Sequence, residues 1–96
     1  MDELEGLFQQ CLDTWGPEIQ IIMLIEELSE LQKELCKWFR DPGNNREGIA
    51  EELADVALMM GQVRYQMKLT EVFDKYVKLK VERLRERLKE EENGSN

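Results

Sequence analysis

Acidic side chains at helical spacing are the residues of this chain best suited to chemistry. The first cluster lies in the segment IEELSELQKEL, residues 25–35, and contains Glu26, Glu27, Glu30 and Glu34. The second lies in AEELAD, residues 50–55, and contains Glu52 and Asp55. Within Glu27/Glu30 and within Glu52/Asp55 the spacing is three residues, so each pair shares one face of a helix. If two such faces oppose each other, their carboxylates offer the oxygen ligands that magnesium and manganese prefer.

The overall composition excludes several other kinds of chemistry and several kinds of partner. The chain has no histidine, so a Ser-His-Asp triad and the Glu-x-x-His pattern of di-iron bundles are both absent. Its 21 acidic and 13 basic residues give a net charge of -8. Nucleic acids and anionic membranes bind basic surfaces, so neither is expected as a partner. No apolar run reaches the roughly 20 residues that span a bilayer.

The sequence favours a cytoplasmic protein. Its first residues, MDELEGLFQQ, are acidic and amphipathic, unlike a signal peptide. The two cysteines, Cys11 and Cys36, are far apart and do not form a CxxC pair. We therefore expect both to be small core residues in a reducing compartment.

The chain is predicted to be an all-α, four-helix bundle-like domain. No segment alternates apolar and polar residues with the period of a strand. The breakers WGPE at 15–18 and RDPGNN at 40–45 divide the sequence, and Asn44 with Glu47 resembles a capping box. The predicted helices span residues 2–14, 17–39, 45–67 and 70–91. Residues 1–92 form the single domain, and residues 93–96 are expected to be a disordered tail.

The two central helices place their acids differently. In the helix over 17–39, the acids lie opposite an apolar stripe made of Leu24, Leu28, Leu31, Leu35 and Trp38, which is typical of a solvated face. The stripe of the helix over 45–67 is Ile49, Leu53, Val56, Met60, Val63 and Met67. Glu52 lies only about 60° from its centre, and Asp55 follows on the same flank. A buried carboxylate needs a positive partner, which a divalent cation could supply.

The last helix is basic, and the chain is short for a monomer. Residues 75–89 hold seven of the thirteen Lys and Arg residues, which is typical of a solvated helix with charge pairs four residues apart. A domain of this size buries a small core. Ile22, Ile25, Ala54 and Leu58 lie outside the two main stripes. We therefore expect a homodimer or a homotetramer.

The acidic clusters resemble a known signature. Glu26-Glu27-x-x-Glu30, followed after twenty-one residues by Glu52-x-x-Asp55, is similar to the EExxE…ExxD pattern of the all-α nucleoside triphosphate pyrophosphohydrolases. This superfamily includes MazG, dimeric dUTPases and phosphoribosyl-ATP pyrophosphatase, and the short MazG-like proteins are the most similar. The resemblance covers nearly the whole chain. It implies hydrolysis of a nucleoside triphosphate to the monophosphate and pyrophosphate.

The resemblance also implies roles for individual residues. Magnesium, or manganese in its place, would be bound by Glu27, Glu30, Glu52 and Asp55. Catalysis would involve Glu26 and Glu27, with Glu26 orienting water or holding a further ion. Substrate contacts would come from Lys78 and Arg83 to the phosphates and from Trp15, Trp38 and Arg46. A tryptophan at a helix end in a small bundle is more often a core residue, and Arg46 is equally well explained as a solvated loop residue. The chain departs from several relatives at Glu82, where they have Asn, and at Met59, where some have an aromatic residue.

Two alternatives to an enzyme stay open at this point. One is a non-catalytic helical module that binds a partner helix, in which loss of Glu52 or Asp55 is neutral or stabilising. The other is a nucleotide or metal sensor built on the same fold.

Overall fold

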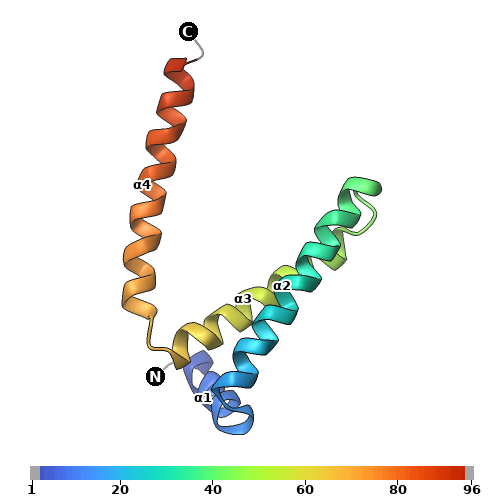
Figure 1. The fold of residues 1–96 in the computed structure, drawn as a ribbon, viewed down its shortest axis with the longest axis vertical. Helices are drawn as coiled ribbons and strands as arrows, with labels where there is room; N and C mark the ends of the chain where they lie inside the picture. The colour runs from blue at the N-terminus through green and yellow to red at the C-terminus, as the bar shows by residue number, and fades with distance from the viewer. Residues whose placement is uncertain (1–2, 95–96) are drawn as a thin grey trace.

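The computed structural model describes residues 3–94, and these form four α-helices joined by short loops (Figure 1). The helices are α1 (Glu3–Trp15), α2 (Pro17–Arg40), α3 (Arg46–Gln66) and α4 (Thr70–Gly94). The described residues contain no strand, which confirms the all-α prediction. Because α4 continues to Gly94, residues 93 and 94 are helical and not part of a disordered tail. Positions 1–2 and 95–96, including the predicted helix start at residue 2, lie outside the described residues.

The break between α1 and α2 is a single residue. Gly16 has φ 84°, a left-handed conformation that glycine adopts without steric cost. Pro17 follows in the first turn of α2, where its fixed φ suits a helix and its missing N–H is not needed. The sequence WGPE therefore ends one helix and starts the next, as predicted.

Asn45 stabilises the turn between α2 and α3 by two hydrogen bonds. Its Nδ2 donates to the main-chain oxygen of Glu34 at 2.7 Å and to Oε2 of the same residue at 2.9 Å. Asn45 is also the residue that precedes α3, and its side chain makes no capping hydrogen bond to that helix. The predicted capping box of Asn44 and Glu47 is therefore wrong, because α3 begins one residue later and the neighbouring asparagine binds across the hairpin.

Replacing Asn45 with alanine should weaken the hairpin. The variant loses the hydrogen bond to the Glu34 carbonyl, and such a bond contributes about 1 kcal/mol. We expect the free energy of unfolding in urea to fall by about that amount. Asn44→Ala, in the same loop but exposed, serves as the control and should change it little. Equal losses in both variants would contradict a specific role for Asn45.

Helix α1 packs on α3 through Phe8 and Gly61. The Phe8 side chain is buried, and a Cβ at position 61 would lie 3.1 Å from its ring. The lack of a side chain at Gly61 therefore lets the phenyl ring approach the α3 backbone. One turn further on, the Tyr65 hydroxyl donates to Oε1 of Gln9 at 2.6 Å, and its ring lies 6.3 Å from that of Phe8.

The contact between α2 and α3 is more polar than the sequence analysis expected. Gln20 is buried, and Glu27 and Glu34 are half-buried against α3. By contrast, the predicted core stripes are widely exposed at Leu28 (40%), Leu35 (43%), Leu53 (51%), Met60 (43%) and Met67 (52%). The wheel of α2 taken alone placed Glu27 and Glu34 on a face typical of solvent, whereas α2 is rotated so that its acidic edge, and not the centre of its apolar stripe, meets α3.

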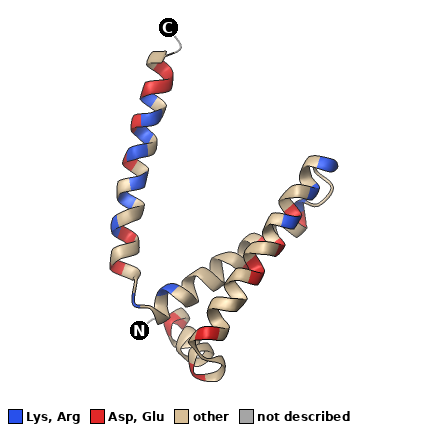
Figure 2. Ribbon diagram, viewed as in Figure 1, with Lys and Arg blue, Asp and Glu red and all other residues tan. Residues whose placement is uncertain are grey.

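Helix α4 stands apart from the other three. It contacts only α3, near its own first turns, and then extends away from the α2/α3 pair at a wide angle (Figure 1). The Arg64 guanidinium lies over the Phe73 ring, 4.4 Å from its centroid, at this junction. The remaining length of α4 carries alternating basic and acidic residues (Figure 2). The protomer is therefore three packed helices with a fourth projecting from them.

The two cysteines and the length of the apolar helices can also be compared with the sequence predictions. Cys11 and Cys36 are free thiols, and Cys36 is exposed, so its assignment to the core was wrong. Within the described part of the chain, no helix combines the length and apolar character needed to cross a bilayer.

Candidate metal centre

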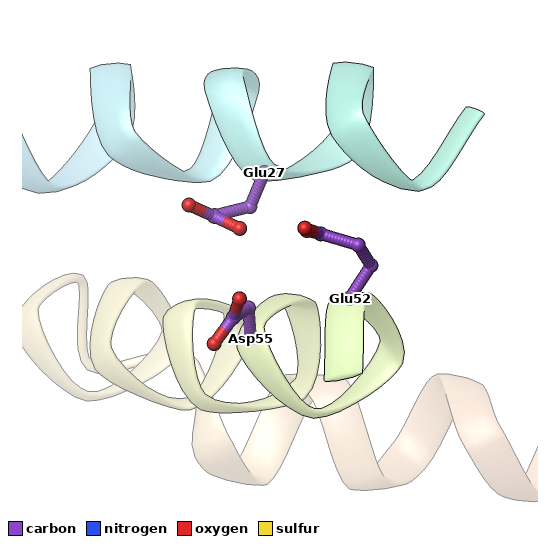
Figure 3. A group of neighbouring side chains, drawn as sticks. All are labelled: Glu27, Glu52 and Asp55. Carbon is purple, nitrogen blue, oxygen red and sulfur yellow. The ribbon is translucent and has the colours of Figure 1, made fainter. Parts of the chain in front are cut away.

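Three of the four predicted metal ligands meet between α2 and α3 (Figure 3). Glu27 comes from α2, and Glu52 and Asp55 come from successive turns of α3. Each side chain offers one carboxylate oxygen, and these oxygens all lie within 4.8 Å of one another. All three residues are half-buried. The three-residue spacing on α3 and the antiparallel α2 thus bring the carboxylates together, and we refer to them as the acidic triad.

Glu52 has the most unusual environment of the three. Its Oε2 is buried and has no hydrogen-bond partner. Burial is the main cause that raises the pKa of this carboxyl above its ordinary value. A hydrogen bond with Glu27 raises the pKa further, as do the negative charges of Glu27, Asp55 and Glu30. Every charged group that shifts this pKa is therefore acidic, and the site carries uncompensated negative charge.

The acidic triad fits a hard divalent cation. The buried Oε2 of Glu52 has lost its contact with water, and this loss must be offset by a positive charge or a hydrogen bond. The donors are all oxygens, which suits magnesium or manganese better than zinc. Three half-buried carboxylates also leave room for the waters that magnesium retains. The residues present thus match the predicted ligand class.

Glu30 and Glu26 lie outside the acidic triad. Glu30 is exposed, although its charge is close enough to raise the pKa of Glu52. Glu26 is also exposed and lies about 100° around the helix from Glu27. The structure therefore groups three predicted ligands, places the fourth at the edge, and leaves Glu26 on the outer side of α2.

The triad belongs to a longer polar seam that the sequence analysis missed. On α2 the seam contains Gln20, Glu27 and Glu34, and on the other side it contains Asn45, which precedes α3, and Glu52 and Gln66 of α3. Each set repeats at multiples of seven residues, the spacing at which one helix keeps the same edge toward a neighbouring helix. At one end Asn45 binds Glu34, and at the other the Gln66 amide donates to the Pro17 carbonyl at 3.0 Å. This seven-residue recurrence of polar residues was the available signal.

The aromatic and arginine candidates are not among the residues that the structure groups at the acidic triad. Trp38 and Arg46 line one surface pocket with Ile49, Ala50 and Leu53, near the α2–α3 turn. Trp38 lies eleven residues from Glu27, which is about 16 Å along the helix axis. Trp15 is 52% exposed at the end of α1. Met59, where some relatives have an aromatic residue, is buried.

The two phosphate-binding candidates lie on α4. Lys78 and Arg83 are both exposed there, and Arg83 lines a surface groove of that helix with Lys80, Leu84 and Arg87. Because α4 projects away from the α2/α3 pair, a single chain does not bring these cations to the acidic triad (Figure 2).

Comparisons of this chain with protein families, with curated proteins and with solved structures find no match.

Proposed function

We propose that the protein hydrolyses a nucleoside triphosphate to the monophosphate and pyrophosphate in a magnesium-dependent reaction. The observation that carries the proposal is the acidic triad, with its buried, unpartnered Glu52 oxygen. The EExxE…ExxD arrangement of the sequence gives the reaction class. In this reaction water attacks the α-phosphorus, the bond from that phosphorus to the bridging oxygen breaks, and pyrophosphate leaves.

Each acidic residue near the site has a proposed role in this reaction. Glu27, Glu52 and Asp55 would hold the cation, with Glu30 at the edge of the site as a further carboxylate. A bound magnesium ion would acidify a coordinated water and offset the charge of the phosphates. With the protein's own carboxylates ionised around it, the site has an acceptor for the proton of the attacking water. Glu26 faces outward and could act only after substrate or a second chain approaches it.

The proposal predicts a specific requirement for a divalent cation. Purified protein should release pyrophosphate and monophosphate from at least one member of a panel of canonical and modified nucleoside triphosphates when magnesium is present. Chelation with EDTA should abolish the release, and manganese should restore it. Release of orthophosphate in place of pyrophosphate would show attack at the γ-phosphorus and contradict the proposed reaction.

A non-catalytic interaction module is the second candidate. It is favoured by the many large apolar side chains that the protomer leaves exposed on all four helices. This function needs no cation, so the module predicts that magnesium changes neither the thermal stability nor the activity of the protein. The absence of both responses across the panel would favour the module and end the enzyme proposal.

A further inference from the structure

The protomer exposes far more surface than a folded monomer of its mass. Its accessible surface is 8000 Å² for 11.4 kDa, whereas a monomeric protein of that mass exposes about 5,800 Å². The excess is about 2,200 Å². The radius of gyration is 17.4 Å, against about 12 Å for a compact domain of this length. An excess of this size matches the area that each subunit of an obligate homodimer buries.

One exposed apolar surface runs along the α2/α3 pair. We call it the α2/α3 flank, and it consists of the half-buried Leu24 and the exposed Leu28, Leu35, Leu53, Met60 and Met67. Two pockets mark its ends. At one, Leu24 and Met60 line a pocket together with the first turns of α4, and at the other, Trp38 and Leu53 line a pocket near the turn. Arg64 lines the first of these pockets and Arg46 lines the second, and the flank lies beside the seam that contains the acidic triad.

A second exposed apolar surface runs along α4. This α4 stripe consists of the half-buried Phe73 and the exposed Val77, Val81, Leu84 and Leu88, which share one side of the helix at spacings of three and four residues. Phe73 lines the same pocket as Leu24 and Met60. The stripe therefore starts against the α2/α3 flank and then diverges from it as α4 projects (Figure 1).

Charge points to the same pairing of surfaces. Residues 75–89, in the middle of α4, hold seven basic and two acidic residues, a net charge of +5, whereas the whole helix is neutral because Glu71, Asp74 and residues 90–92 are acidic. This basic segment lies between acidic residues, and the end of α4 that projects furthest from the other helices is acidic (Figure 2). Residues 1–69 hold six basic and fourteen acidic residues, a net charge of -8. A second copy of the chain carries an acidic body for the basic middle of this α4, and a basic α4 segment for this body.

We infer that two copies of the chain exchange their α4 helices, so that the α4 stripe of each packs on the α2/α3 flank of the other. Both uncovered surfaces are then buried by one two-fold symmetric contact, which closes without leaving either surface free for further copies. The interface brings the exposed basic residues of α4 to the acidic body of the partner subunit. The inference rests on exposed area, apolar surface and charge, and it does not depend on the proposed function.

Two exposed leucines of α4 provide a matched test. Leu84 lies on the α4 stripe and is 56% exposed, while Leu79 is 55% exposed and lies about 140° around the helix from it. Light scattering of the full chain should give at least a dimer mass. Leu84→Asp should raise the dissociation constant at least about 30-fold, and Leu79→Asp should raise it much less. Helicity by circular dichroism should be the same in both variants, because neither leucine is buried in the protomer.

A photo-crosslinking amino acid at position 84 identifies the surface that α4 meets. Mixed isotopically labelled and unlabelled full-length protein should give crosslinked peptides from two different chains, joining position 84 to residues 17–66. The same amino acid at position 79 should give few such products. A monomer mass for the wild-type protein, equal dissociation by both aspartate variants, or crosslinks from α4 to α4 would each overturn the exchange.

Discussion

Asp55→Asn should reduce pyrophosphate release at least about 100-fold, the effect typical of removing one preorganised charged group from an active site. The amide keeps the shape of the side chain but removes one of the three carboxylates that converge between α2 and α3. The variant should also lose most of its thermal stabilisation by magnesium. In the wild-type protein this stabilisation reaches about 2.7 kcal/mol when the free ion is at 100 times its dissociation constant.

A matched control separates loss of the site from loss of charge. Asp74→Asn makes the same chemical change on exposed α4, away from the acidic triad. It should retain both hydrolysis and the response of the melting temperature to magnesium. Without metal, Asp55→Asn should be no less stable than the wild-type protein, because it relieves repulsion among close carboxylates. If Asp55→Asn hydrolyses triphosphates at the wild-type rate, the acidic triad is not the active site.

The helices and the three central ligands were predictable because their causes are local. The adjacent Gly16 and Pro17 form a local break between two helices, and a three-residue spacing places Glu52 and Asp55 on one face whatever surrounds them. The closeness of Glu52 to the apolar stripe also indicated a carboxylate in need of a partner. The orphaned Oε2 of that residue is consistent with this argument.

The rotation of α2 and the position of α4 were not predictable in the same way. Both depend on which surface a helix meets, and a helical wheel ranks faces by hydrophobicity alone. That ranking assigned Glu34 to solvent, whereas its carboxylate accepts hydrogen bonds from Asn45 and Lys37 and has a lowered pKa. The wheel also assigned Leu28 and Leu35 to the core. If a second copy covers these leucines, the wheel identified apolar faces correctly and failed only to say which chain buries them.

The effect of Glu52→Gln on the melting temperature should change sign when magnesium is added. The raised pKa of Glu52 means that the folded protein holds this proton more tightly than the unfolded chain. The resulting stability is complete below the ordinary value of 4.5 and is lost as pH rises through the raised pKa. Without metal, the melting temperature of the variant should therefore exceed that of the wild-type protein increasingly from pH 4.5 upward, and the difference should become constant once Glu52 is fully ionised.

Magnesium should invert this order at neutral pH, because the wild-type protein gains a ligand where the variant has a neutral amide. Glu51→Gln, the same change at an exposed neighbouring position, should follow the wild-type protein under both conditions. Differential scanning calorimetry with EDTA and with magnesium measures all three proteins. A non-catalytic bundle also predicts that losing the Glu52 charge is stabilising, but it predicts the same order with and without the metal. The inversion therefore distinguishes a Glu52 that binds a metal ion from a Glu52 whose charge is only destabilised by burial and by the neighbouring acids.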